Sequence, residues 1–217
     1  MHFSNKIYFL LFLCAGCYSS EHTEKEANIR LEISPPEPDK DLREKYEANL
    51  KTENGCSFSN PDTSVYKIEL LDQASSSRVV GNDYKLVENN VDMPHVSFNS
   101  SDNKQILTLF FHYGGARNSF SEFQVQINNG LQKNRPVNTQ IFATNNNIKL
   151  GLTKESLIQI LGSCYTASLI NDKEVLKYII DDSMSSFLKL YNYPSYYGHY
   201  EFKAGRLVKF RFGFEYP

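Results

Sequence analysis

An alternation of apolar and polar residues near the C-terminus constrains the fold of this 217-residue chain more than any other feature. A period of two predicts a β-strand with one buried and one solvated face, and it fixes the register of that strand against its neighbours. The turn Lys203-Ala204-Gly205-Arg206 precedes this strand, so we expect an antiparallel hairpin over residues 198–216. The side chains predicted to face the core are Val208, Phe210, Phe212, Phe214 and Tyr216, and those predicted to face solvent are Lys209, Arg211 and Glu215.

Residues 148–162 predict one short helix, with Thr153 as its N-cap and Gly162 as its C-terminal stop. Leu152 and Leu157 stand where a hydrophobic staple would close the first turn. The apolar face extends over only about two turns, which is too little for stability alone in water. We therefore expect this helix to pack on the C-terminal hairpin.

Most of the chain after residue 64 has the pattern of strands. There is no Trp, but the 14 Tyr and 15 Phe gather in alternating segments, which is typical of sheets. The sequence thus predicts an α+β fold that is rich in sheet, with mostly antiparallel strands and one short helix packed on the C-terminal aromatic hairpin. The other expected strands cover residues 65–70, 84–87, 96–98, 106–113, 123–127, 140–143, 174–180 and 187–191, and residues 75–82 are expected to form a polar loop.

The first residues have the form of a secretory signal peptide. The apolar run over residues 7–14 is shorter than the roughly 20 residues of a membrane-spanning helix and has the length of a signal-peptide core. Ala15-Gly16-Cys17 follows, and this triplet resembles the cleavage site of bacterial lipoprotein precursors. That family usually has Leu, Val or Ile three residues before the cysteine, where this chain has Cys14. Ordinary secretion is the alternative interpretation.

The lipoprotein resemblance implies that the signal peptide, residues 1–16, is removed and that acyl chains on Cys17 hold the mature protein to a membrane. We expect a place in the bacterial cell envelope, at the outer membrane in preference to the inner one. Residues 17–54 are rich in Glu, Lys, Asp and Pro and have the composition of a flexible tether. The folded part is expected to comprise an antiparallel β-rich region over 55–147 and a helix with an antiparallel sheet over 148–217, packed together.

The second half also resembles the small BamE-like (SmpA/OmlA) outer-membrane lipoproteins and the related β-lactamase-inhibitor-protein-like fold. The matching segments are Gly151-Leu152-Thr153-Lys154-Glu155, Leu157, Ile160-Leu161-Gly162, Tyr200-Glu201-Phe202 and Gly205-Arg206-Leu207-Val208. Ser163-Cys164 stands where that family has a proline, and a second helix before the sheet is not evident. The resemblance implies a binding or scaffold module that presents a sheet face or loops to a partner protein, and not an enzyme.

Two cysteines, Cys56 and Cys164, would remain in the mature protein besides Cys17. An oxidising envelope would allow them to form a disulfide. The alternative is two separate thiols, because the sequence does not place the two Cα atoms within the roughly 7 Å that a disulfide requires.

The sequence shows no motif of a catalytic or metal site. His95, His112 and His199 are isolated, and Asp181-Asp182, which could hold a cation, has the pattern of a solvated strand end. We expect no metal and no cofactor. The formal net charge of −2 and the absence of a basic cluster argue against a nucleic-acid partner.

A cluster of tyrosines between residues 191 and 200 is the candidate for a recognition surface. Tyrosine offers a large amphipathic contact area at low entropic cost. If the rings are exposed, they suit a partner protein, or a carbohydrate or other small ligand; if they are buried, they are packing at the edge of the sheet. The residues concerned are Tyr191, Tyr193, Tyr196, Tyr197 and Tyr200.

Overall fold

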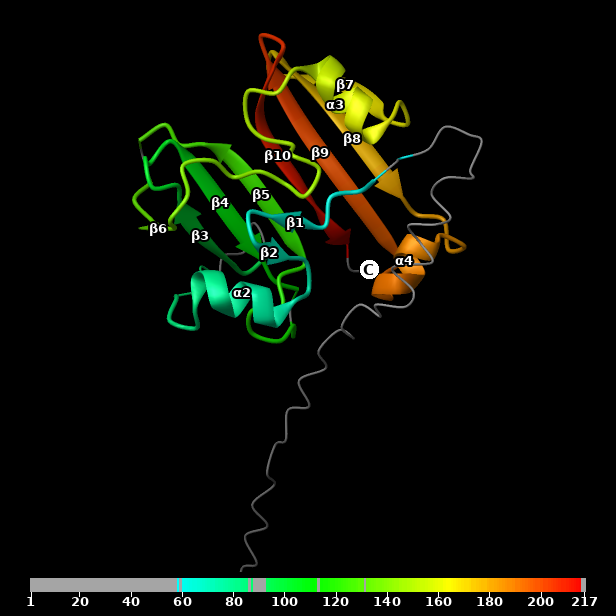
Figure 1. Cartoon of the computed structure of the whole chain (residues 1–217). Helices are drawn as coiled ribbons and strands as arrows, with labels where there is room; N and C mark the ends of the chain where they lie inside the picture. The colour runs from blue at the N-terminus through cyan, green and yellow to red at the C-terminus, as the bar shows by residue number, and fades with distance from the viewer. Residues whose placement is uncertain are drawn as a thin grey trace, which may run out of the picture. The chain divides into compact units, whose positions relative to one another are not determined.

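The computed structural model describes residues 58, 60–85, 87, 93–112, 114–130 and 132–215. Within these residues, eight strands form one sheet in the order β6-β3-β4-β5-β10-β9-β8-β7, shown in Figure 1. All neighbouring strands run antiparallel except β3 and β6. The strands are β3 (His95–Asn99), β4 (Gln105–Phe110), β5 (Glu122–Ile127), β6 (Arg135–Pro136), β7 (Thr166–Ile170), β8 (Lys173–Ile180), β9 (Ser195–Lys203) and β10 (Arg206–Glu215).

The two regions that the sequence predicts after the tether share this sheet. Strand β5 belongs to the first region and β10 to the second, and the two pair over five residues from Gly213 opposite Glu122 to Lys209 opposite Gln126. The described residues therefore form a sheet-rich α+β fold with mostly antiparallel strands, as predicted. The predicted signal peptide, Cys17 and the predicted tether lie outside the described residues.

One face of the sheet carries the hydrophobic core and the described helices. The helices are α2 (Gln73–Val80), α3 (Lys154–Leu161) and α4 (Ser186–Tyr191), and a small two-stranded sheet of β1 (Ser64–Val65) and β2 (Ile68–Glu69) lies with them. In Figure 1, α2 and the β1–β2 pair lie in front of the green strands and α3 in front of the yellow to red ones. Buried residues of all three helices, such as Val80, Leu157 and Phe187, belong to one cluster with the strands.

The C-terminal hairpin has the predicted turn and pairing. Ala204 and Gly205 adopt positive φ at the turn, and Phe210 pairs with Tyr200. The register shifts between Leu207 and Lys209, which is a β-bulge. Because of the bulge, Leu207 is buried and Val208 is only half-buried, which corrects the core position predicted for Val208.

The predicted helix is α3, and its capping is confirmed. The hydroxyl of Thr153 accepts a hydrogen bond from the backbone N–H of Ser156 at 3.2 Å, and the N–H of Gly162 closes the last turn on Ile158. The segment before α3 is bound to β10, because the N–H of Leu207 donates to the carbonyl of Leu152 at 2.9 Å. The start of the helix is thus fixed to the hairpin by main-chain hydrogen bonds.

Three further predictions of local structure are wrong. The strand predicted over 65–70 is the β1–β2 hairpin, because Tyr66 turns with φ of 59°. The polar loop predicted over 75–82 contains α2, which begins at Asp72; its carboxylate accepts from the N–H of Ala74 at 2.8 Å. The strand predicted over 187–191 is α4, which Ser185 caps and Asn192 ends in the left-handed conformation. The described fold therefore has three helices where the sequence predicted one.

Two other expected strands do not form within the described residues. Of the segment 84–87, Val87 makes an isolated bridge with His95, and of 140–143, Ala143 makes one with Lys149. The remaining predictions hold to within a few residues, with β3, β4, β5 and β8 at the expected places. Strand β4 lies inside the sheet between β3 and β5, as its nearly continuous apolar sequence predicts.

Candidate functional site

One face of the sheet carries mostly apolar side chains and the other mostly polar ones, as rows of paired residues across the strands show. Directly paired residues of neighbouring strands point to the same face, so a row can be followed across seven strands. One row, which faces the core, is Phe98, Leu107, Val125, Phe210, Tyr200, Leu176 and Ala167. The next row, which faces away from the core, is Ser97, Thr108, Gln124, Arg211, His199, Lys177 and Thr166.

We call this second side of β3–β5 and β7–β10 the polar sheet face. No described helix packs on it, since the buried residues of α3 and α4 and the buried Val80 of α2 all belong to the core cluster on the other side. Thr108, Phe110, Glu122 and Tyr197 are buried within this face, while Gln124, Gln126 and Lys177 are half-buried on it. With its long polar side chains, the face is the broadest candidate for a binding surface in the described part of the chain.

A cluster around Glu122 lies on the polar sheet face at one end of the middle strands β4, β5, β10 and β9. Arg211 Nε donates to Glu122 Oε2 at 2.7 Å, and the hydroxyl of Tyr197 donates to the same oxygen. The Arg211 guanidinium also lies 3.9 Å from the centre of the Phe110 ring, which it covers. Burial, together with the charge of Glu122, raises the pKa of Tyr197. The three polar groups are thus committed to one another and hold this part of the surface rigid.

Gly213 permits the close approach of β10 to β5 beside this cluster. A Cβ atom at Gly213 would lie 2.2 Å from the carbonyl oxygen of Ser121 and 2.6 Å from the Cα of Glu122. Its φ of 150° is also a value that residues with a side chain rarely adopt. The position of the Glu122 carboxylate therefore depends on a glycine in the neighbouring strand.

A hollow of about 450 Å³ lies on the polar sheet face near β7. Its charged groups are Lys173, Lys177 and Glu201, with His199 beside them. Glu201 accepts ion pairs from Lys173 at 2.8 Å and from Lys209 at 3.1 Å. Burial alone would raise the pKa of Glu201, but the two lysines outweigh it and leave that pKa below its usual value.

The cations of the hollow outnumber its anion. Lys177 makes no ion pair with a described residue, so its charge remains available. Burial first and the nearby Lys177 second lower the pKa of His199, which keeps that imidazole neutral at pH 7. The hollow therefore favours a ligand with negative charge.

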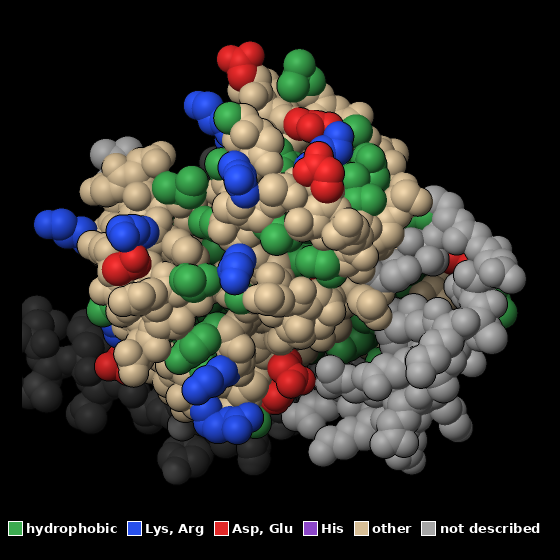
Figure 2. Space-filling model, turned by 45° about the horizontal axis from the view of Figure 1, so that its top comes forward, with side chains coloured by type: hydrophobic (Ala, Val, Ile, Leu, Met, Phe, Trp, Pro, Cys, Tyr) green, Lys and Arg blue, Asp and Glu red, His purple; other side chains and the backbone are tan. Residues whose placement is uncertain are grey.

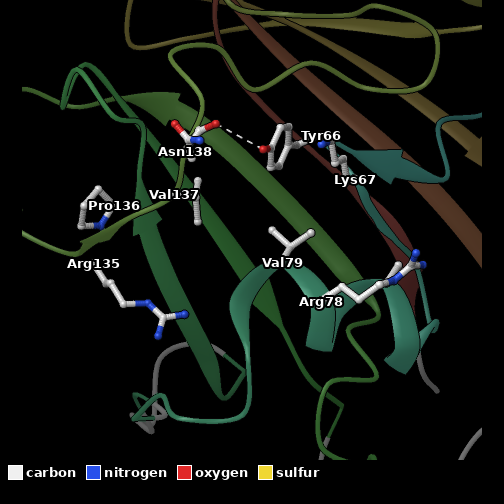
Figure 3. A pocket seen from close by; sticks show the side chains of 9 residues that line it. Tyr66, Lys67, Arg78, Val79, Arg135, Pro136, Val137 and Asn138 are labelled. Atoms are coloured by element: carbon white, nitrogen blue, oxygen red, sulfur yellow. Dashed lines mark hydrogen bonds between the residues drawn. The ribbon is translucent and has the colours of Figure 1, made fainter.

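A larger pocket of about 740 Å³ lies on the opposite side, between α2 and the segment around β6 (Figure 3). It contains Lys67, Arg78 and Arg135 and no acidic residue. Arg135 donates to the carbonyl of Val80, the last residue of α2, and to the carbonyl of Asp83, which follows the helix. Its guanidinium lies over the Phe98 ring. Arg78 extends away from Arg135 in Figure 3. The two guanidinium groups thus do not converge on one point, and Arg135 binds the carbonyl groups at the C-terminal end of α2.

The surface on this side shows no concentration of one charge. With the top of Figure 1 turned forward, acidic, basic and hydrophobic side chains are interspersed (Figure 2). Neither a basic nor an acidic field of the kind that attracts nucleic acid or a charged membrane surface is visible in this view.

A carboxylate lies in the core on the other side of the sheet. Asp62 is completely buried and accepts hydrogen bonds from Asn146 Nδ2 at 3.0 Å and from the hydroxyl of Tyr200 at 3.2 Å. The hydroxyl of Tyr196 donates to the backbone oxygen of Asp62 at 2.6 Å. Burial raises the pKa of Asp62 to about 6. This group fastens the segment before β1 to strand β9.

The tyrosine cluster predicted as a recognition surface lies inside the protein. Each of the five rings is 6% exposed or less. Tyr191 and Tyr193 pack on Phe214 with ring centres 4.7 and 4.8 Å away, and Tyr197 belongs to the Glu122 cluster. This burial corrects the interpretation of Tyr191, Tyr193, Tyr196 and Tyr197 as an exposed binding surface, and it matches the packing alternative.

The remaining candidate residues do not gather at one site. Cys164 is disulfide-bonded, while Cys56 lies outside the described residues, so the pairing of these two stays a prediction. Asp181 and Asp182 are exposed, and the Asp182 side chain accepts a hydrogen bond from the N–H of Met184.

No group of three or more His, Cys, Asp or Glu within the described ranges is arranged to hold a metal ion. Within the same ranges, no helix is long and apolar enough to cross a membrane.

Comparisons with family models, with curated proteins and with solved structures give no match to this chain.

The sequence alone indicates which side chains lie on the polar sheet face, since Glu122, Gln124 and Gln126 alternate with apolar residues, as do Lys209 and Arg211. No sequence pattern predicts the contact between Glu122 and Arg211, because the alternation within each strand does not determine which strands pair.

Proposed function

We propose that this protein is a lipid-anchored protein of the bacterial cell envelope and a non-enzymatic binding or scaffold module for another protein, which it contacts through the polar sheet face. The observation that supports the proposal is the polar row across seven strands with no described helix above it. Such a surface offers many hydrogen-bonding groups on a stiff frame, which suits the polar interfaces of non-obligate complexes.

A binding role fits the chemistry of the face better than catalysis. A general acid or base must be able to exchange a proton with a substrate. Glu122 instead shares its carboxylate with Arg211 and Tyr197, and Glu201 is held by two lysines. These two carboxylates therefore have structural partners.

Attachment to the membrane is proposed from Ala15-Gly16-Cys17 and the tether composition of residues 17–54. Fractionation of the bacterium should find the wild-type protein with the membranes and the Cys17→Ser variant in the soluble fraction. Loss of metabolic labelling by a fatty acid in the same variant would identify the acyl chain. Equal membrane association of the two proteins contradicts this part of the proposal.

Binding through the polar sheet face is tested by photo-crosslinking in the intact cell. A photoreactive amino acid at Gln126, half-buried on this face, is expected to form a discrete crosslinked product with a second protein. The matched control is the same substitution at Gln159, which is exposed on α3. The proposal is wrong if both positions give the same products, or if Gln126 gives none.

A further inference from the structure

The two edges of the eight-stranded sheet are built differently. Strand β6 has two residues, pairs in parallel and ends at Pro136, which has no N–H to offer. Strand β7 has five exposed residues, Thr-Ala-Ser-Leu-Ile, without a charge or a proline. Natural sheets usually blunt an edge with short strands, charges or proline to prevent pairing with other chains. β6 has this protection, and β7 does not.

Strand β7 also exposes apolar side chains. Leu169 is 77% exposed and Ile170 is 54% exposed, the former on the core side and the latter on the polar side of the sheet. In the described part of the chain no strand lies beyond β7. The edge therefore combines unprotected backbone with apolar surface.

The turn after β7 determines which backbone groups point outwards. Asn171 and Asp172 have φ of 47° and 61°, which is the geometry of a two-residue type I′ hairpin. Ile170 and Lys173, which flank this turn, form a hydrogen-bonded pair, and such pairs alternate along an antiparallel ladder. Ala167 and Leu169 consequently direct their N–H and carbonyl groups away from β8, towards the open edge.

The hollow of the polar sheet face lies directly beside this edge. Thr166, Ser168 and Ile170 form its outer wall. On the inner side Lys177, which makes no ion pair with a described residue, gives the hollow its positive charge, because Glu201 is neutralised by Lys173 and Lys209. A strand added to β7 would direct every second side chain towards this hollow.

We propose that β7 receives an extended segment of a partner protein as a ninth antiparallel strand, and that this segment carries carboxylate side chains on the positions facing the hollow. This inference rests on the proposed function and specifies the partner's contact segment. Main-chain hydrogen bonds to Ala167 and Leu169 give affinity, and attraction between a carboxylate and Lys177 gives specificity and orientation. Apolar side chains on the alternate positions cover Leu169.

The test uses the folded protein with a display library of random ten-residue peptides. Selected peptides are expected to alternate β-branched with acidic residues and to contain no proline in the alternating part. Affinities are then measured for one selected synthetic peptide and for its Glu→Gln counterpart. The acidic form should bind about two- to fivefold more tightly at low salt, a difference that disappears at high salt.

Variants of the edge locate the peptide. Ala167→Pro removes an outward N–H and should weaken binding at least about tenfold, as should Leu169→Lys. Lys177→Gln should remove the preference for the acidic peptide. The matched control is Ile127→Lys, which places the same charge on an exposed apolar position of the inner strand β5, on the core side of the sheet like Leu169 and distant from the hollow. Thermal unfolding of each variant confirms that it is folded.

The inference is overturned if no peptide is enriched, if the enriched peptides lack alternation or acidic residues, or if binding is unchanged in Ala167→Pro and Leu169→Lys. Sedimentation that shows a dimer of the protein dispersed by Leu169→Lys would assign the edge to a second copy and reject the acidic segment. If the Gln126 crosslink persists in Leu169→Lys while the peptide results fail, the proposed function stands and only the β7 inference is lost.

Discussion

The hydroxyl of Tyr200 donates a hydrogen bond to the Asp62 carboxylate at 3.2 Å, across 138 residues of sequence. The contact joins the segment before β1 to the middle of β9, deep in the core. A carboxylate in such a place is costly to ionise, because the charged form loses the solvation it has in water. The pH dependence of stability follows from this relationship.

We predict that stability falls as the pH rises through the range from about 4 to about 6. The folded protein holds the Asp62 proton up to a pKa of about 6, against an ordinary value of 3.8 for the unfolded chain. The unfolded state therefore binds fewer protons in this range, and the free energy of unfolding loses up to about 3 kcal/mol as the pH increases. Urea unfolding at several pH values measures this dependence.

Asp62→Asn isolates the contribution of this one group. The amide keeps the shape and can accept from Tyr200, but it does not titrate. The difference in unfolding free energy between wild type and variant should therefore change between pH 4 and pH 6 and be constant above pH 7. A difference that does not depend on pH would show that Asp62 is not the titrating group.

Removal of Arg211 should take away the ion pair that its guanidinium makes with the Glu122 carboxylate at 2.7 Å. The Glu122 side chain is 5% exposed and that of Arg211 is 20% exposed, so solvent only partly replaces the lost partner. We expect Arg211→Met to lower the free energy of unfolding by about 2–3 kcal/mol, somewhat less than for a fully buried pair. The double variant Arg211→Met, Glu122→Gln should recover part of this loss. Additive effects of the two substitutions, measured by urea unfolding, would argue against the coupling.

Gly213→Ala tests the close contact between β10 and β5. The added methyl group meets the backbone of Ser121 and Glu122, which cannot move without disturbing the pairing. We expect a loss of about 2–3 kcal/mol in unfolding free energy. Gly130→Ala is the control, because Gly130 also has a positive φ but has open space around it, and it should cost only about 1–2 kcal/mol. Equal effects would mean that backbone conformation alone explains the requirement for glycine at residue 213.

The parts of the fold that the sequence predicts well are those where one strong local pattern decides. The alternation from Lys209 to Glu215 predicts correctly which side chains of β10 face the core, although Val208 before it is displaced by the bulge and Tyr216 lies outside the described residues. The caps at Thr153 and Gly162 mark both ends of α3. Helix α2 has no such pattern, because three of its eight residues are serines and only Val80 among its apolar residues is buried. The sequence feature that indicates α2 is Asp72, which is a favourable N-cap residue.

The site was less predictable than the fold, for a physical reason. The tyrosines of residues 191–200 suit both an interface and a core, and only the packing of Tyr191 and Tyr193 on Phe214 distinguishes the two. Likewise, nothing local to β7 says that it lies at an edge. That property belongs to the strand order, which long-range pairing determines.

Helix α3 depends on its N-cap, because the helix has only eight residues and a short helix gains little from its own hydrogen bonds. The Thr153 hydroxyl accepts from the N–H of Ser156, which would otherwise lack a partner in the first turn. We expect Thr153→Ala to cost about 1 kcal/mol in unfolding free energy and Thr153→Ser to cost almost nothing, since serine keeps the acceptor. Amide hydrogen exchange of residues 154–157 should become faster in the alanine variant alone. Equal losses in the two variants would show that the methyl group of Thr153, and not its hydroxyl, stabilises the start of α3.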